Sequence, residues 1–320
     1  MNATVVVATH LGGSRLERLL DSLAAQTRIA RTIVVDNASR DGVAGLVARH
    51  EFAEHLRLEE NVGFARAVNL AAGRTDDDAL VLVNDDCVCE PAFVEELAGA
   101  LDPAAGVVMA AGVLVEARDP ETIDTAGMEL DRTLLVFDYL NGEPVESLTG
   151  STPPPIGPCG AAAAFDRAAF LEAGGFDERL FAYWEDVDLV LRLVGAGGRC
   201  ALAPGARGRH EHSATLGSGS REKNYLTGFG SGYVLRKWSV LGSPRRAARA
   251  ALQAGILCTG QALFDRTLAG ARGRLDGWMA AAHVPPKPYP EAVLGAQPPL
   301  SSVLARRARR RGRLRRRAAS

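Results

Sequence analysis

The stretch TVVVATHLGGSRLERLLDSLAAQTRIARTIVVDN (residues 4–37) contains a strand, a helix and a second strand in succession, and this order determines the architecture. Its two ends, Thr4–Ala8 and Thr32–Asp36, are short runs rich in β-branched residues, which favour strands. Between them, Arg15–Ala25 places its leucines at helical spacing on one face. Two strands joined through such a helix are expected to run parallel in one sheet.

The same alternation continues over the first hundred residues. Further strands are predicted at Leu56–Glu59 and Ala79–Val83, and helices at Asp41–His50, Phe64–Ala72 and Pro91–Leu101. Alternating strands and helices with short connections indicate a mostly parallel sheet covered by helices on both faces. We therefore expect an α/β, Rossmann-like fold.

The remainder is less regular. A strand is predicted at Gly106–Val115, a hairpin or loop over 120–150, a helix at Trp184–Val194 and a short strand at Cys200–Ala203. From about Tyr225 to Ala282 the sequence consists of helices rich in Ala, Leu and Arg. A proline-rich segment follows and leads into an arginine-rich tail.

The charge is unevenly distributed along the 320 residues. Lys and Arg total 37 and Asp and Glu total 38, but nine arginines lie between Arg306 and Arg317. Without these nine, 28 basic side chains face 38 acidic ones, a charge of −10. An acidic body argues against a general nucleic-acid binder, and 47% hydrophobic residues argue against disorder throughout.

The cysteines and the termini indicate the compartment. The five cysteines form no C-x-x-C pair, so neither a disulfide framework nor a zinc site is predicted. No basic segment precedes the first apolar run, and the longest uncharged stretch, Ala250–Phe264, is too short to span a bilayer. These features predict a cytoplasmic protein that is soluble or lies at the membrane surface.

Polar side chains follow all four predicted strands. Thr9, Asp36 and Asn61 each lie at or after a strand end, and Asn84–Asp86 follows the fourth strand. The carboxyl ends of parallel strands meet at one edge of a sheet, where ligands bind, although Asn and Asp also favour ordinary turns. Because Asp85 and Asp86 repel each other, Mg²⁺ or Mn²⁺ would stabilise them and leave sites for phosphate oxygens. A ligand site with a divalent cation is therefore favoured.

A second acidic cluster is WEDVD (184–188). On a helix, Asp186 shares a face with the apolar stripe that includes Leu189. It is either a carboxylate that interacts with the helix dipole or a general base in a cleft, where burial would raise its pKa. Asp188 lies four residues before Arg192, a spacing that predicts an ordinary pair on the helix surface.

Two histidines, His210 and His212, follow at a spacing that places them on the same side of a strand. Either could be a metal ligand beside Asp86 or an ordinary surface residue, and His210 is preferred. The next segment, 215–223, is rich in Gly and Ser and fits either a mobile lid or a linker.

Together these motifs resemble the inverting family 2 glycosyltransferases of the GT-A fold. The bacterial members that build cell-wall or surface polysaccharide, including rhamnosyl- and galactofuranosyltransferases, are the most similar. The resemblance runs from about Thr4 to Gly217. It is carried by VVVATH (5–10), VVDNAS (34–39), NVGFARAVN (61–69), LVNDDC (82–87), GGFDERLFAYWEDVDLVLR (174–192) and HEHSATLG (210–217).

The resemblance implies a role for each matching position. The donor nucleotide sugar would be held by Thr9, Asp36, Asn61, Asn69 and Asp85. The metal, Mg²⁺ or Mn²⁺, would be held by Asp86 and His210, and the acceptor cleft would be shaped by Tyr183, Trp184 and Glu185. Asp186 would be the catalytic base. The chain departs from the family at the first position of the D-x-D-like motif, which is Asn84.

The implied organisation follows the same pattern. Residues 1–225 would form the GT-A catalytic domain, with nucleotide-sugar binding in about 1–115 and the acceptor and catalytic part in about 116–225. Residues 226–284 would be a helical extension, and 285–320 a proline-rich linker and arginine-rich tail without fixed structure.

The implied reaction is metal-dependent transfer of a sugar, with inversion, from a UDP- or dTDP-linked donor. The acceptor would be a hydroxyl of a glycan or lipid-linked molecule in cell-envelope polysaccharide synthesis. One alternative is a sugar-1-phosphate nucleotidyltransferase, whose basic glycine-rich loop Gly12–Leu16 faintly matches, although the chain has only three lysines. Another is a non-catalytic, membrane-peripheral protein that binds nucleotide or acts as a scaffold.

The C-terminal third allows several interpretations. Its arginines near Arg245 and apolar residues such as Leu252 and Ile256 suit an interfacial helix, but also a helix packed on its own domain or a dimer contact. The tail at 306–317 would bind anionic lipid at the inner face of the plasma membrane, or would be solvated without a role. No nucleic-acid partner is expected, and the sequence does not predict the oligomeric state.

Overall fold

The computed structural model describes residues 1–211 and 219–291. The predictions for His212 and for the tail at 306–317 concern residues outside this part. The strands are β1 (Ala3–Thr9), β2 (Arg31–Asp36), β3 (Ala53–Arg57), β4 (Ala79–Val83), β5 (Cys87–Cys89), β6 (Val107–Glu116), β7 (Asp119–Thr125), β8 (Met128–Leu130), β9 (Val136–Asp138), β10 (Ala162–Asp166) and β11 (Arg199–His210). The helices are α1 (Ser14–Ala24), α2 (Val43–Val47), α3 (Gly63–Ala72), α4 (Phe93–Gly99), α5 (Arg167–Glu172), α6 (Glu185–Gly195), α7 (Arg221–Lys237), α8 (Pro244–Phe264) and α9 (Ala269–Ala280).

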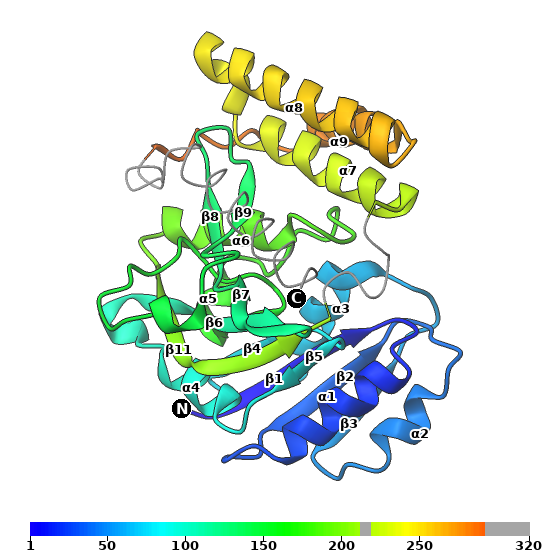
Figure 1. The fold of residues 1–320 in the computed structure, drawn as a ribbon, viewed down its shortest axis with the longest axis vertical. Helices are drawn as coiled ribbons and strands as arrows, with labels where there is room; N and C mark the ends of the chain where they lie inside the picture. Colours follow the sequence, from blue (N-terminus) through cyan, green and yellow to red (C-terminus); the bar gives the residue numbers. More distant parts are fainter. Residues whose placement is uncertain (212–218, 292–320) are drawn as a thin grey trace, which may run out of the picture.

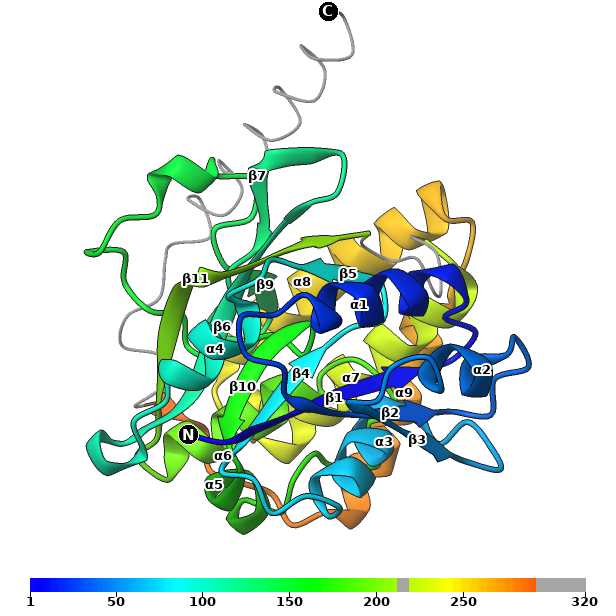
Figure 2. The same ribbon diagram turned by 90° about the horizontal axis from the view of Figure 1, so that it is seen from below.

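The described residues form one large, curled sheet with the strand order β3-β2-β1-β4-β10-β6-β11-β5, and β7 pairs with β6. Strands β3, β2, β1 and β4 run parallel and lie side by side in Figure 2. Strand β10 is antiparallel to β4 and β6, and β11 is parallel to β6. The predicted α/β fold, with a mostly parallel sheet, flanking helices and a C-terminal helical extension, is confirmed.

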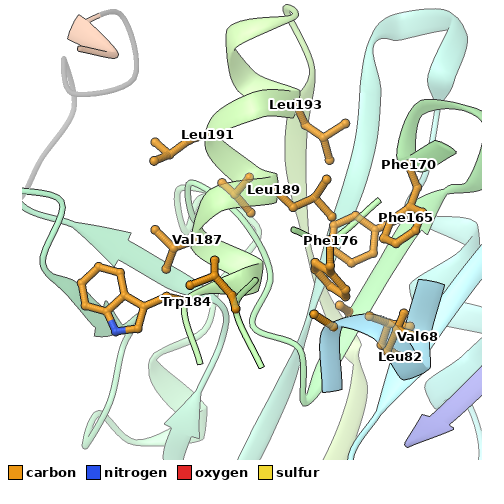
Figure 3. Close-up of a cluster of buried hydrophobic side chains, with 14 of the residues drawn as sticks. Val68, Leu82, Phe165, Phe170, Phe176, Trp184, Val187, Leu189, Leu191 and Leu193 are labelled. Carbon is orange, nitrogen blue, oxygen red and sulfur yellow. The ribbon is translucent and has the colours of Figure 1, made fainter. Parts of the chain in front are cut away.

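Two hydrophobic layers cover the sheet because successive strand residues point to opposite faces. In β1, Val5 and Val7 pack with α1, α2 and α4, whereas Val6 packs with α3, α5 and α6. Figure 3 shows part of the second layer, where Leu189 and Leu193 of α6 approach Phe165 and Phe176. This packing fixes α6, which carries the second acidic cluster, against the sheet.

Some boundaries differ from the predicted ones. The predicted helix Asp41–His50 is only the five residues of α2, and the third strand ends at Arg57 rather than Glu59. The largest error concerns β11, which was predicted as Cys200–Ala203 but spans twelve residues and reaches His210. Pro204 and Gly205 interrupt its middle, where the register with β6 shifts, so its sequence looks like a strand end followed by a loop.

The helical extension consists of α7, α8 and α9, which lie together at one end of the molecule (Figure 1). Helix α7 begins at Arg221, so the predicted boundary at residue 225 falls inside a helix. The first turn of α7 faces the carboxyl ends of the strands, and α9 packs along α7.

Candidate functional site

A cavity of about 710 Å³ lies at the carboxyl ends of β1 and β4, beneath the first turn of α7. Nine of the eleven residues predicted for the site line it: Thr9, Asn61, Asp85, Asp86, Tyr183, Trp184, Glu185, Asp186 and His210. The topology explains this convergence, because parallel strands deliver their carboxyl ends to the same edge of the sheet.

Asp36 and Asn69 do not line the cavity. Asp36 is fully buried at the end of β2, where Arg57 donates to its carboxylate at 2.7 Å and the Ser39 N–H donates at 2.7 Å. Burial alone would raise the pKa of Asp36, but these hydrogen bonds and that from His55 lower it. Asn69 bonds instead to the backbone of Phe176, through its oxygen at 2.8 Å and its amide at 2.9 Å. The structure thus gives Asn69 a structural contact away from the cavity.

Asn37, next to Asp36, does line the cavity. Its side-chain oxygen accepts from the N–H of Val62 at 3.2 Å, and its amide donates to the carbonyl of Gly63 at 3.4 Å. Asn37 therefore fixes the loop that carries Asn61.

Thr9 and Asp85 form a buried pair across β1 and β4. The hydroxyl of Thr9 donates to Oδ2 of Asp85 at 2.6 Å. A Cβ at Gly12 would collide with Thr9 and lie 2.8 Å from Asp85, so only glycine fits the start of this loop. Burial raises the pKa of Asp85 to about 6, and the Asp86 carboxylate adds to this, whereas the Thr9 hydrogen bond lowers it. A cation close to both carboxylates would stabilise their charged forms.

Strand β11 ends at His210, which pairs with Cys87 of β5. Because Cys87 directly follows Asp86 in the chain, this pairing places His210 beside Asp86. Nε2 of His210 is 3.3 Å from Oδ1 of Asp86, and Nδ1 is 2.7 Å from Oδ2 of Asp124 on β7. Burial alone would lower the pKa of His210, but the hydrogen bonds to Asp124 and Asp86 raise it to about 9. Asp124 thus orients the ring so that Nε2 faces Asp86.

Asp86, Cys87 and His210 each offer one atom, and these atoms lie within 4.8 Å of one another, as metal ligands do. Burial, with the Asp86 charge, raises the pKa of the Cys87 thiol well above its usual range, so this sulfur stays protonated and is a poor ligand. The carboxylate of Asp86 and Nε2 of His210 fit a divalent cation, which would displace the proton that Nε2 holds beside Asp86. Asp124 on the other ring nitrogen matches the usual support of a metal-binding histidine.

The turn before α6 directs Asp186 into the cavity. Tyr183 and Trp184 both have positive φ, 70° and 76°, in a region that side chains other than glycine rarely adopt. The buried Trp184 ring packs on Gly230 of α7, where a Cβ would lie 2.5 Å from it. This anchored turn lets the first turn of α6 open onto the cavity.

Glu185 is buried and the adjacent Asp186 is half-buried, and desolvation raises the pKa of both carboxyl groups. Asp186 accepts hydrogen bonds from the N–H of Gly160 at 3.2 Å and of Val187 at 2.8 Å, which stabilise its charged form. Oε2 of Glu185 is buried without a hydrogen-bond partner among the described residues. Of the two carboxyl groups, Glu185 is therefore the one that takes up a proton first, and Asp186 is the one whose charged form is stabilised and can accept a proton.

The comparisons with known proteins agree with this geometry. The family model for Glycosyl transferase family 2 matches residues 4–147. An N-acetylglucosaminyl-diphospho-decaprenol L-rhamnosyltransferase of Mycobacterium tuberculosis is 30% identical over 238 residues, which are 67% of this chain and 77% of the relative. The chain belongs to glycosyl transferase family 2. A second relative of this glycosyltransferase, the pre-mycofactocin glycosyltransferase of the same species, is 29% identical over 73% of this chain and 48% of its own length.

Solved structures show that this family 2 glycosyltransferase has the GT-A fold. GalNAc-T7, solved with UDP, GalNAc and Mn²⁺, superposes with a TM-score of 0.58 at 16% identity, over 74% of this chain. The chain covers about half of GalNAc-T7, 48% of its length. The mannosyltransferase PcManGT from Pyrobaculum calidifontis, solved with GDP-Man and Mn²⁺, has a TM-score of 0.52 at 18% identity and covers 96% of this chain and 79% of its own.

Asp188 differs from its prediction as a surface residue. It is fully buried and accepts hydrogen bonds from Lys237 at 2.9 Å, the Trp238 indole at 3.0 Å and Arg192 at 2.9 Å. The spacing of Asp188 and Arg192 is as predicted, but α7 covers the pair. The WEDVD cluster of the glycosyltransferase therefore has two faces, with Asp186 in the cavity and Asp188 against the extension.

Five further charged side chains line the cavity that were not predicted for the site: Arg15, Asp124, Asp138, Glu222 and Lys223. Asp124 and Asp138 come from the segment predicted as a hairpin or loop, whose composition shows no pattern that marks them. Lys223 lies over the Tyr183 ring, with 5.7 Å from its nitrogen to the ring centre. The scarcity of lysine was the one available signal, because Lys223 is one of only three in the chain.

Proposed function

We propose that the protein transfers a sugar, with inversion, from a UDP- or dTDP-linked donor to a hydroxyl of a glycan or lipid-linked acceptor, in a reaction that requires Mg²⁺ or Mn²⁺. The observation that carries this proposal is the meeting of two sites in one cavity: the Asp86–His210 pair and the Asp186 carboxylate. We assign the reaction to cell-envelope polysaccharide synthesis.

The donor half of the cavity lies at the strand ends. Thr9, Asn61 and Asp85 offer hydrogen-bonding groups to the nucleoside, and Asp86 and His210 would hold the cation. A bound cation would neutralise the negative charge of the diphosphate as it leaves. Without a cation, the carboxylates of this cavity would repel the diphosphate. The acidic lining therefore fits a site in which a divalent cation lies between the carboxylates and the diphosphate.

The acceptor half lies at the start of α6. Asp186 would accept the proton of the attacking hydroxyl, and because Glu185 takes up a proton first, Asp186 stays charged for this task. Burial raises the pKa of Tyr183 to about 12, so its phenol stays protonated and can donate a hydrogen bond to an acceptor oxygen. A base opposite the leaving group supports a single displacement, which inverts the anomeric carbon.

A lipid-linked acceptor is supported by the rhamnosyltransferase relative, whose name specifies a decaprenol-linked substrate. Among the described residues, no helix is both long and apolar enough to cross a membrane. We propose that the enzyme works at the cytoplasmic face of the membrane and that the arginines at 306–317 contribute to its attachment there.

The test is a donor screen with the full-length protein, a divalent cation and a mixture of lipid-linked acceptors. The expected result is release of nucleoside diphosphate, loss of activity with EDTA, recovery with Mn²⁺ or Mg²⁺, and a product of inverted anomeric configuration by NMR. Release of pyrophosphate would instead indicate nucleotidyl transfer. Absence of both turnover and a thermal shift with any nucleoside diphosphate and Mn²⁺ would indicate a non-catalytic protein.

A further inference from the structure

The extension exposes an unusual number of large apolar side chains. Of the fifteen that are exposed in the described part of the chain, eight lie between residues 252 and 279. These eight define the apolar outer face: Leu252, Ile256, Leu257, Leu263, Phe264, Leu268, Leu275 and Met279. Their exposed fractions range from 39% to 85%, and Phe264 is the most exposed. A cluster of this kind marks an interaction surface rather than scattered surface residues.

Helical spacing aligns several members of this face within each helix. Leu252, Ile256 and Leu263 share one side of α8, and Leu275 and Met279 share one side of α9. Figure 1 shows α8 and α9 on the outer side of α7, at the end of the molecule away from β3. The apolar outer face therefore points away from the protein's own core.

The side of α9 that faces α7 carries glycines rather than large apolar side chains. Gly273 and Gly277 lie against the carbonyls of Tyr225 and Phe229 on α7, where a Cβ would collide with the backbone. Helices that pack through glycines while their large apolar side chains point outward are typical of a lipid environment, in which burying apolar side chains between helices gains little.

The charges around this face favour an anionic partner. From Pro244 to Met279 there are six arginines and two aspartates, whereas the first 305 residues carry ten more acidic than basic side chains. Arg245 and Arg266 are exposed near the two ends of α8, and neither forms an ion pair with another described residue. A twofold contact between two copies would place these arginine-rich faces against each other, which is unfavourable.

We propose that the apolar outer face lies in the headgroup region of an anionic bilayer, with α8 and α9 parallel to the membrane surface. Arg245 and Arg266 then meet lipid phosphates while the apolar side chains enter the acyl boundary. Helix α7 separates this face from the cavity, which it lines with Leu226 and Thr227. The cavity therefore lies close to the membrane, where a lipid-linked acceptor would be; this last point rests on the proposed function.

The experiment is flotation of the full-length protein with vesicles of phosphatidylcholine containing about one third phosphatidylglycerol. Ile256→Glu combined with Phe264→Glu is expected to lower the bound fraction by about tenfold or more, because two charges would enter the acyl boundary. The matched control, Ile29→Glu with Leu171→Glu, changes two exposed apolar residues outside the extension and should bind as the wild type does. Both variants should keep the wild-type melting temperature, since all four positions are exposed.

One further variant makes the result decisive. In a full-length variant with the nine arginines at 306–317 changed to glutamine, binding should weaken but persist. If that variant lost all binding while Ile256→Glu/Phe264→Glu kept it, the tail alone would anchor the protein and the proposal would be wrong. Light scattering tests the other occupant of the face, a second copy of the chain. If the wild type did not bind vesicles but formed a dimer, and the double variant were a monomer, the face would be a dimer contact and the proposal would be wrong.

A substitution that keeps the face apolar gives an independent measurement. The fluorescence of Phe264→Trp should shift to the blue and be quenched by brominated lipid, relative to the wild type; an unchanged spectrum would contradict insertion. Vesicle binding needs neither donor nor acceptor, so a failure to bind vesicles would not argue against the proposed glycosyltransferase activity. Conversely, loss of the proposed activity would not alter flotation.

Discussion

The sheet and the helical extension are built on opposite patterns. In α1, which covers the sheet, four leucines are buried and define the packed face. In α9 the buried residues are Ala269 and three glycines, and in α8 only Ala250 is buried. Large apolar side chains thus point into the protein around the sheet and away from it on α8 and α9, whereas those of α7, such as Tyr233 and Val234, pack into the core.

This difference shows how each part is held in place. The sheet is stabilised by two continuous apolar layers. The extension shares one of these layers through Tyr233 and Trp238. It also joins α6 through a buried ionic network, in which Lys237 contacts Asp177 at 2.7 Å and Asp188 at 2.8 Å. A substitution in the cavity can therefore lower the catalytic rate without lowering the free energy of unfolding. A substitution in the ionic network should mainly lower the free energy of unfolding.

The largest expected effect is that of Asp186→Asn on turnover. Loss of the general base should lower kcat by about 10²–10⁴-fold while the melting temperature stays close to the wild type. The matched change at the neighbouring position, Glu185→Gln, should keep most activity, because Glu185 is the one of the two that takes up a proton first. Steady-state kinetics of both variants decide this. Near-normal turnover of Asp186→Asn, or an equal loss in Glu185→Gln, would overturn the assignment.

The next effect is on stability, in the extension. Lys237→Met leaves two buried carboxylates, Asp177 and Asp188, without their shared cation, and breaking a buried ion pair in this way costs about 3–5 kcal/mol. Denaturant unfolding should show this loss, with Lys287→Met, a half-exposed lysine, as the control. If Lys237→Met unfolds like the wild type, the network does not hold the extension.

A smaller effect is expected at the metal site. Asp124→Asn weakens the support of His210, and loss of such a partner typically lowers metal affinity about 10–100-fold. The Mn²⁺ concentration that gives half-maximal activity should rise by this factor, while turnover at saturating Mn²⁺ changes little. Asp102→Asn, an exposed residue at the opposite end of β6 from β7, is the control. An unchanged Mn²⁺ requirement in Asp124→Asn would remove Asp124 from the metal site.

The parallel half of the sheet could be predicted because its strands are buried on both faces. Such strands are continuous apolar runs, as in Ala79–Val83, and the loops between them are short. The later strands of the sheet could not be predicted equally well, because pairing between segments distant in sequence defines them. Strand β11 shows this most clearly, since Pro204 and Gly205 hide a strand that only its pairing with β5 and β6 reveals.

The same distinction applies to the site. Residues at the ends of parallel strands, such as Thr9 and Asp86, could be placed by the topology alone. Asp124 and Lys223 could not, because they reach the cavity from β7 and α7, which no local pattern places there. The spacing of Asp188 and Arg192 predicts a surface pair, but it contains no information about α7. The contact of Asp188 with Lys237 at the end of α7, some fifty residues later in the chain, is what buries it.

The smallest effect concerns acid stability and tests whether the extension separates before the sheet unfolds. Burial alone would raise the pKa of Asp177, but the hydrogen bonds from Lys237 and Tyr233 lower it to about 2. A carboxyl group whose pKa is lower in the folded state stabilises that state above its ordinary pKa of 3.8, and this contribution disappears as the pH falls toward 2. Between about pH 4 and pH 2, amide exchange in α7 and α9 should therefore accelerate before exchange in β1 and β4. Asp177→Asn, which cannot titrate, should lack this early step, and simultaneous exchange of both regions in the wild type would show that the network does not act separately from the sheet.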